Sequence, residues 1–341
     1  MPQLSVIVPT YNREDALEGC LKAVKASIFR DYELLVVDCG SQDTTCAIAR
    51  RYADRVIEIH GVPSSGAARN RGVAAATGEV IVNVDSDVIV RPDTLSRIAD
   101  YFSHHPETDA LTGLLSKGHP HRGFFSQYKN LYMHFIFRQL PERVMFLYGS
   151  LHAFRRRVAR PYGVVVRMTD DLAFGQQLIR EGKRIAFVRD LEVTHLKRYN
   201  AWSLIANDFQ APCDWAIVFL AYKGWKHLGR YRIGFAHVSK EQLVSVALAP
   251  VIVLAGLLNR SRPQEIVWMT GLVVCWFLLN LRFLAFLTKE KGAIFGLWGC
   301  ALTFLDHLIM AAGIVCGFVY ALIKAVVQRP SSFAPWPPQG S

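Results

Sequence analysis

Hydrophobic and polar positions in the first hundred residues alternate between short apolar runs and longer amphipathic stretches. The runs are rich in β-branched residues, which favour buried strands, and they lie at residues 5–9, 32–37, 56–59 and 80–84. Segments with helical spacing or a small-residue helix start separate them, at residues 14–27, 43–52 and 64–72. Strands that alternate with helices predict an α/β fold with a mostly parallel sheet and helices on both faces.

Polar residues at the ends of these runs predict where the helices begin. Asn12 is expected to cap the helix over residues 14–27, and Asp43 the helix that ends at Tyr52. Pro9 is expected to close the first strand, and Pro92 suits the first turn of a helix that runs to about residue 102.

The C-terminal third of the chain follows a different pattern, with apolar stretches at about residues 243–258, 266–287 and 294–327. A bilayer span needs about 20 mostly apolar residues, which the second and third stretches supply. The first is shorter and contains Pro250, so it is expected to tilt, kink or re-enter. Before these stretches, residues 199–235 interleave aromatic and basic side chains, which is typical of helices lying on a bilayer surface.

These patterns divide the chain into a soluble part and a membrane part. The expected boundaries are an α/β domain, interfacial helices, two or three membrane spans and a disordered, proline-rich tail, at residues 1–198, 199–240, 241–328 and 329–341. Asp306 and His307 lie within the last span, where ionisable groups are functional candidates, and they could hold a lipid headgroup or pack against another span.

Composition narrows the classes of function. Of the 341 residues 51% are hydrophobic, and the net charge is +11, which suits anionic lipids or an anionic substrate. No nucleic-acid-binding motif occurs, so no nucleic-acid partner is expected. The seven cysteines include no C-x-x-C pair, which argues against a disulfide framework or a zinc site. The first residues lack the pattern of a signal peptide, so we expect the soluble domain to stay in the cytosol.

Candidate chemistry centres on Asp85 and Asp87, which follow the run at residues 80–84. Open α/β sheets bind ligands at the carboxyl ends of their strands. Carboxylates suit Mg²⁺ or Mn²⁺, which usually bind with one or two carboxylates and substrate phosphates. The pair therefore indicates a metal–diphosphate site; the alternative is a solvated turn with helix-capping aspartates.

Four segments in order resemble the signature series of family 2 glycosyltransferases. They are Ser5-Val6-Ile7-Val8-Pro9-Thr10-Tyr11-Asn12-Arg13, Val36-Val37-Asp38-Cys39-Gly40-Ser41-Gln42-Asp43, Gly66-Ala67-Ala68-Arg69-Asn70-Arg71-Gly72 and Asp85-Ser86-Asp87. The resemblance covers roughly residues 4–200 and implies the GT-A nucleotide-sugar-binding fold. Cys39 departs from the family, which often has an acidic residue there.

The resemblance also implies roles for single residues in the first half of the domain. The residues expected to line the nucleobase and ribose pocket are Pro9, Tyr11 and Asp38. Arg69 and Asn70 are expected near the donor, Asp85 facing the nucleotide and Asp87 holding the metal.

The second half supplies the expected catalytic base. Gly149 and Ser150 resemble the family's glycine-rich stretch beneath the donor sugar, although the family often has a second glycine and an asparagine here. The acid pair Asp170–Asp171 opens a predicted helix; capping explains it as well, but Asp171 matches the family's base and Asp170 is expected at the substrate. In some GT-A enzymes a late histidine completes the metal site, and His195 is the candidate here.

Together these features predict an inverting glycosyltransferase of the inner (plasma) membrane, multi-pass, with a cytosolic catalytic domain. It would use Mg²⁺ or Mn²⁺ and a nucleotide-diphosphate sugar, with UDP favoured by the family, and a hydroxyl of a lipid or lipid-linked acceptor. A polyprenyl-phosphate glycosyltransferase is one alternative, and a non-catalytic membrane scaffold with the same fold is another. A processive synthase is disfavoured, because Gln210 and Trp215 do not form the expected Gln-x-x-Arg-Trp motif.

Overall fold

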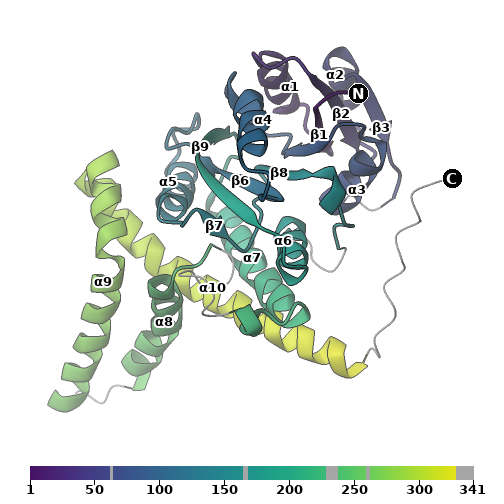
Figure 1. The fold of residues 1–341 in the computed structure, drawn as a ribbon. Coiled ribbons are helices and arrows are strands. Elements are labelled where there is room, and N and C mark those ends of the chain that lie inside the picture. The colour runs from purple at the N-terminus through teal and green to yellow at the C-terminus, as the bar shows by residue number, and fades with distance from the viewer. Residues whose placement is uncertain (62–63, 164–167, 228–236, 259–261, 328–341) are drawn as a thin grey trace.

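The N-terminal part of the chain folds around one mixed β-sheet (Figure 1). The structure, a computed structural model, describes residues 1–61, 64–163, 168–227, 237–258 and 262–327. Within them the strand order is β3-β2-β1-β4-β8-β6-β9-β5, and β7 also pairs with β9. The strands are β1 Leu4–Thr10, β2 Tyr32–Asp38, β3 Arg55–Glu58, β4 Val80–Val84, β5 Val88–Ile89, β6 Ala110–Leu115, β7 Arg143–Val144, β8 Leu151–Arg155 and β9 Ile185–His195.

The sheet has a parallel half and a mixed half. Strands β1 to β4 pair in parallel, as the alternating pattern predicts. Strand β8 is antiparallel to both β4 and β6, whereas β6 and β9 are parallel. Parallel strands need helical crossovers between them, and the alternation that indicates such crossovers is confined to the first hundred residues. The α/β class is therefore confirmed, with a sheet that is mixed rather than mostly parallel.

Helices cover both faces of this sheet (Figure 1). Helix α3 packs on β1 and β2, α1 packs on α2 and β5, and α5 packs on β6. The helices that precede the three long apolar ones are α1 Leu17–Lys25, α2 Thr45–Tyr52, α3 Ser65–Ala75, α4 Thr94–His104, α5 Phe124–Arg138, α6 Asp170–Arg180 and α7 Ala201–Ala221, with 3₁₀ turns at Arg156–Val158 and Gly224–His227.

The helix starts differ from the sequence prediction in their caps. Asn12 does not cap α1; it has a φ of 48°, and its Oδ1 accepts a hydrogen bond from the Gln42 amide at 2.8 Å. It therefore joins the loop after β1 to the loop after β2. Asp43 Oδ1 accepts from the Thr45 amide at 3.0 Å, at the start of α2. Pro9 does not end β1, which continues to Thr10.

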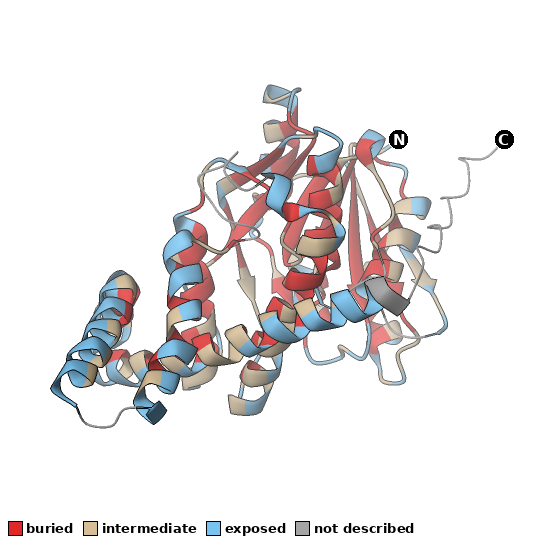
Figure 2. Cartoon of the chain, turned by 90° about the horizontal axis from the view of Figure 1, so that it is seen from below, coloured by how far each residue is buried: buried red, intermediate tan, exposed pale blue. Residues whose placement is uncertain are grey.

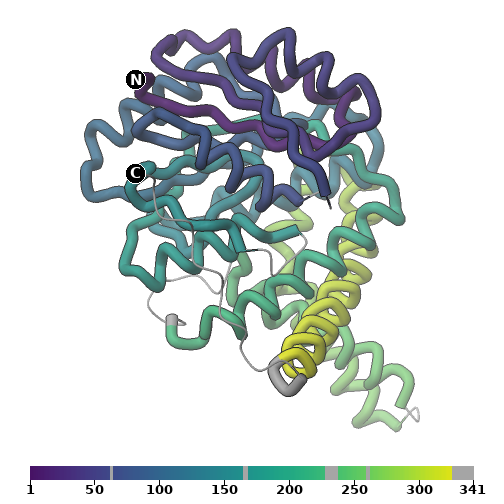
Figure 3. Tube along the Cα trace, turned by 90° about the vertical axis from the view of Figure 1, so that its right-hand side faces the viewer, coloured from purple at the N-terminus to yellow at the C-terminus, as the bar shows by residue number. Residues whose placement is uncertain are grey.

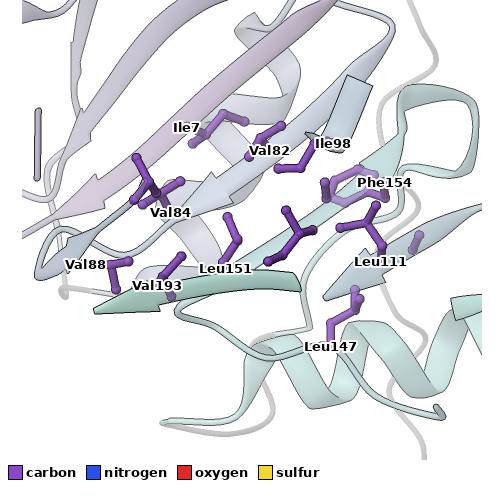
Figure 4. Close-up of a cluster of buried hydrophobic side chains, with 14 of the residues drawn as sticks. Ile7, Val82, Val84, Val88, Ile98, Leu111, Leu147, Leu151, Phe154 and Val193 are labelled. Carbon is purple, nitrogen blue, oxygen red and sulfur yellow. The ribbon is translucent and has the colours of Figure 1, made fainter. Parts of the chain in front are cut away.

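A continuous apolar core holds the two halves of the sheet together. Figure 4 shows side chains from β1, β4, β6, β8, β9 and α4 in contact, including Ile7, Val82, Ile98, Leu111 and Phe154. All of these are buried. Because the strands of both halves share this core, the loops at their ends are held in fixed positions relative to one another.

Three further helices are long and apolar enough to cross a membrane, judged by length and composition. They are α8 Lys240–Leu258, α9 Pro263–Lys291 and α10 Ala293–Val327. Figure 2 shows the hairpin of α8 and α9 as mostly exposed. Polar contacts join the three helices: Asn280 donates to Ser245 at 3.1 Å, and Trp276 donates to His307 at 3.0 Å. The tail predicted to be disordered lies outside the described residues.

Helix α10 lies against α7, as Figures 1 and 3 show. Two glycines of α10 make this contact close. A Cβ added to Gly313 would lie 2.3 Å from the Phe209 carbonyl oxygen, and one added to Gly317 would lie 2.2 Å from the Cys213 carbonyl oxygen. Small residues four positions apart let two helix backbones approach in this way.

We expect Gly317→Ala to destabilise the protein by about 1–3 kcal/mol, because the added methyl overpacks the contact between α7 and α10. Gly271→Ala in α9 is the matched control, since nothing lies within 4 Å of an added Cβ there. Thermal unfolding of the detergent-purified protein measures both variants. Equal melting temperatures for the two variants would contradict the close contact.

Candidate active site

The carboxyl ends of β1 and β4 open into a cavity of about 460 Å³. It lies where an open α/β sheet binds its ligands. Several residues that the sequence singled out line it together, although they come from strands, loops and a helix far apart in the chain: Pro9, Tyr11, Asp85, Asp87, Gly149, Ser150, Asp171 and His195. Ser150 precedes β8, which pairs with β4, and this pairing brings the second half of the chain to the aspartates.

Arg69 connects the two acid pairs from behind the cavity. Its Nη2 lies 2.6 Å from Asp85 Oδ1, and its Nη1 lies 2.5 Å from Asp170 Oδ2. The guanidinium also lies over the Tyr162 ring, 5.7 Å from the centroid. Gly66 of α3 makes room for α6, since a Cβ there would lie 3.3 Å from Asp170 Oδ2. The side chains of Arg69 and Asp170 are only 3% and 6% exposed, so this ion pair is shielded from water, whereas Asp85 is 30% exposed toward the cavity.

Asp171 faces the cavity and, in contrast to Asp170, has no arginine or lysine paired with it among the described residues. Its Oδ1 accepts a hydrogen bond from the Leu172 amide at 2.8 Å. Burial, with the adjacent charge of Asp170, raises the pKa of the Asp171 carboxyl to about 7. A carboxyl group with such a pKa can accept a proton at neutral pH.

Asp87 has the opposite environment. Its Oδ2 lies 2.9 Å from Arg13 Nη2, and its Oδ1 lies 3.2 Å from His195 Nε2. Burial alone would raise the pKa of Asp87, but His195, Arg13 and Lys197 lower it to about 2. Asp87 is therefore ionised at neutral pH, whereas Asp171 titrates there.

The donor atoms around Asp87 suit a hard divalent cation in their chemistry. Asp85 and Asp87 supply carboxylate oxygens to one cavity, and His195 lies beside them. Within the described ranges, no three His, Cys, Asp or Glu side chains gather so that they could hold a metal ion. A cation bound by two carboxylates needs oxygens from the substrate as well, which is the usual arrangement for Mg²⁺ with phosphates.

Four residues of the predicted site do not line the cavity in the described part of the chain: Asp38, Asn70, and the Arg69 and Asp170 pair that lies behind it. Asp38 holds the turn after β2, since its Oδ2 accepts hydrogen bonds from the amides of Gly40 and Ser41, at 3.0 and 2.8 Å. Asn70 holds the backbone of Tyr162, with hydrogen bonds of 2.7 and 3.1 Å. Neither belongs to the described residues that line the cavity.

The cavity also contains polar residues that the sequence reading did not single out: Arg13, Lys129, Lys197, Tyr199, Asn207 and Asp208. Arg13 is the last residue of the segment around Tyr11, so its position in that segment was a signal for it. Lys129 and Asp208 lie in helices without a recognisable motif, and only the packing of α5 and α7 brings them to the cavity.

Gly149 separates the two groups of acids. An added Cβ there would lie 3.2 Å from Asp85 Oδ2 and 3.3 Å from Asp171 Oδ2. We expect Gly149→Ala to lower activity by about 10- to 100-fold, because displacing reacting groups by a fraction of an ångström is costly. Gly118→Ala is the control, since nothing lies near its Cβ. Steady-state kinetics of the two purified variants test this, and equal rates would count against the site.

Residues 5–163 match the model of a protein family described as Glycosyl transferase family 2. This part of the chain is similar to family 2 glycosyltransferases. The match includes the cavity residues from Pro9 to Ser150 and ends before Asp170, Asp171 and His195.

Proteins similar to the first part of the chain are named as glycosyltransferases. A PGL/p-HBAD biosynthesis glycosyltransferase of Mycobacterium bovis is 36% identical over 118 residues, which are 33% of this chain and 46% of that protein. Glycosyltransferase AglE of Haloferax volcanii is 35% identical over 104 residues, 28% of this chain and 34% of that protein. The matched part thus spans less than half the length of these relatives.

A solved structure supports the fold over most of the chain. Mannosyltransferase PcManGT from Pyrobaculum calidifontis, in complex with GDP-Man and Mn²⁺, resembles this chain with a TM-score of 0.58. The likeness covers 94% of this chain and 87% of that one, at 20% sequence identity. It confirms the GT-A fold that the sequence motifs imply.

Proposed function

We propose that this protein is a membrane-bound, inverting glycosyltransferase that moves a hexose from a nucleotide-diphosphate sugar to a hydroxyl group of a lipid or lipid-linked acceptor. The observation that carries the proposal is the pair of aspartates in one cavity. Asp87 stays ionised, while burial raises the pKa of Asp171 to about 7. The carboxyl group that stays ionised suits an electrostatic role, and the one with the raised pKa suits the acceptance of a proton.

The donor would lie across the ends of β1 and β4. Pro9 and Tyr11 line that part of the cavity, and Asp38 shapes the neighbouring turn of the nucleoside pocket. Gly149 and Ser150 would lie beneath the sugar, and Asp85 would face the nucleotide with Arg69 and Asn70 behind it. A UDP-sugar is the first donor to test, because UDP is common in the family.

Asp171 would act as the base. It takes the proton of the acceptor hydroxyl while that oxygen bonds to the anomeric carbon, and the bond from this carbon to the diphosphate breaks with its electron pair on the leaving oxygen. Asp170 cannot share this task easily, because Arg69 holds its carboxylate at 2.5 Å. Attack opposite the leaving group inverts the anomeric centre.

A divalent cation fits the charges beside the leaving group. Asp87 and Asp85 would hold Mg²⁺ or Mn²⁺, with His195 next to Asp87. When bound, such an ion stabilises the negative charge that develops on the diphosphate. Mn²⁺ is also present in the solved mannosyltransferase that shares the fold.

The acceptor and the location follow from the apolar helices. Helices α8, α9 and α10 would span the inner membrane, with the catalytic domain on the cytosolic side. A polyprenyl phosphate is the second candidate acceptor, but it is already ionised at pH 7 and needs no base. The environment of Asp171 favours a hydroxyl group.

The experiment is hydrolysis of UDP-, GDP- and TDP-sugars by detergent-purified protein, with membrane lipid extract, with and without Mn²⁺. We expect turnover of one donor that requires both lipid and metal. In Asp87→Asn, donor binding measured by calorimetry should lose its dependence on Mn²⁺. Absence of donor binding in the wild type would favour a non-catalytic scaffold instead.

The rate of transfer should rise with pH through about 7. Below this pH the Asp171 carboxyl is protonated and cannot accept a proton, and above it the carboxylate is available. Initial rates of the wild type between pH 5 and 9, at fixed ionic strength, measure this dependence. A rate that is flat across this range would contradict the role of Asp171 as base.

A further inference from the structure

The cavity continues beyond the ends of β1 and β4, where the donor would lie, toward the helices that would face the membrane. Its walls there come from α5, α7 and α10, with Lys129, Asn207, Asp208 and Met310 among the lining residues. Met310 belongs to α10, the last apolar helix. The same cavity therefore joins the ends of β1 and β4 to the membrane part of the protein.

Three arginine and lysine side chains line this cavity in the described part of the chain, and two of them pair with an aspartate. Arg13 pairs with Asp87 at 2.9 Å, and Lys129 pairs with the buried Asp208. In the described ranges, no aspartate or glutamate oxygen lies within 4.0 Å of the Lys197 Nζ, the distance limit for a salt bridge. The residues outside the described ranges include no aspartate or glutamate.

Neutral groups hold Lys197 in place. Its Nζ donates to Asn207 Oδ1 at 3.0 Å and lies 4.9 Å from the centroid of the Tyr199 ring. Asn207 Nδ2 in turn donates to Asp208 Oδ1 at 2.8 Å. The backbone beside Lys197 is held next to Asp87, because the Leu196 amide donates to the Asp87 carbonyl at 2.7 Å.

A half-buried ammonium group with no carboxylate in direct contact is costly, and an anionic ligand beside it would offset that cost. Lys197 lies between Asp87 and α7, where the substrates of the proposed reaction would bind. Both of these substrates can carry phosphate, so a phosphate group is the anionic ligand that fits this position. The donor has a diphosphate, and a lipid-linked acceptor has a phosphate next to its lipid.

We propose that Lys197, oriented by Asn207 and Tyr199, binds a phosphate group of the substrate on the α7 side of the cavity. The assignment rests on the proposed function, since it identifies the charge of a substrate of that reaction. The proposal adds a requirement to that of an acceptor hydroxyl at Asp171. When this hydroxyl reaches Asp171, a phosphate oxygen of the donor or of the acceptor must lie within reach of Lys197.

Calorimetry on the full chain in detergent tests the phosphate site without requiring turnover. The probes are UDP and GDP for the donor, farnesyl diphosphate for the acceptor, and the neutral uridine and farnesol as controls. In Lys197→Met we expect one class of diphosphate to bind at least 10-fold more weakly, the loss expected for a hydrogen bond to a charged group. Uridine and farnesol should not change. Lys22→Met, which removes the same charge from the exposed face of α1, should behave as the wild type.

The two sources give different results. Weaker binding of the nucleotides alone assigns Lys197 to the donor diphosphate, and weaker binding of farnesyl diphosphate alone assigns it to the acceptor. Unchanged binding of both classes overturns the proposal. A wild type that binds these probes but transfers no sugar would contradict the proposed reaction and not the phosphate site.

A second measurement uses the wild type alone, in case Lys197→Met does not fold. Acetic anhydride labels accessible lysines, and mass spectrometry reads the extent at each position. Inorganic pyrophosphate should protect Lys197 and leave Lys22 labelled as before. Equal labelling of Lys197 with and without pyrophosphate would overturn the proposal.

Discussion

Replacing Asp171 by asparagine is expected to slow sugar transfer to a hydroxyl acceptor by about 10²- to 10⁴-fold, the usual contribution of a general base. The amide is close in shape to the carboxylate, so the hydrogen bond from the Leu172 amide can persist with the side-chain carbonyl as acceptor. Donor binding should change little, because Asp87 and Asp85 are untouched. Single-turnover transfer, measured beside donor affinity, separates the two effects.

The control for this variant is Asp100→Asn, which neutralises an exposed carboxylate on α4. It should transfer sugar at the wild-type rate. If Asp171→Asn also retains most of its activity, the acceptor is a phosphate rather than a hydroxyl, and the base assigned here is not needed.

Replacing Arg69 by methionine is expected to destabilise the protein by about 3–5 kcal/mol, the cost of removing one partner from a buried ion pair. Asp85 and Asp170 would lose the cation that lies 2.6 and 2.5 Å from them. Because α3 contacts α6 through this cluster, the loss should affect unfolding of the whole domain. Thermal or denaturant unfolding of the detergent-purified protein measures it.

Arg97→Met provides the comparison, because Arg97 also pairs with an aspartate, at 2.7 Å, but is 43% exposed. Exposed ion pairs contribute at most about 1 kcal/mol. Arg69→Lys should not restore the stability fully, since one ammonium group cannot reproduce the two forked contacts. Equal stabilities of Arg69→Met and Arg97→Met would contradict a buried bridge.

The sequence allowed the strand ends to be predicted because local patterns determine them. The β-branched run before Asp85 is β4, and the acid pair Asp170–Asp171 does open α6. Apolar stretches of sufficient length likewise became α8, α9 and α10. Each of these predictions needed only neighbouring residues.

The contacts that join the site could not be predicted in the same way. Arg69 and Asp170 are 101 positions apart, and either could have belonged to a surface pair. Asn12 was a reasonable helix cap by residue type, but the loop after β2 offered its side chain another partner. The mixed half of the sheet was not predicted, because the second half of the soluble domain has no regular alternation of strands and helices.

The glycines of α10 have a consequence for which acceptors can react. Gly313 and Gly317 bring α10 within backbone contact of α7, and α7 also supplies a wall of the cavity. If α10 is embedded in the bilayer, the end of the cavity at β1 and β4 is held at a constant distance from the lipid. For the proposed reaction, we then expect an acceptor to react only when the distance from its lipid anchor to its hydroxyl matches that distance, so the length of the acceptor would affect selectivity as well as its sugar.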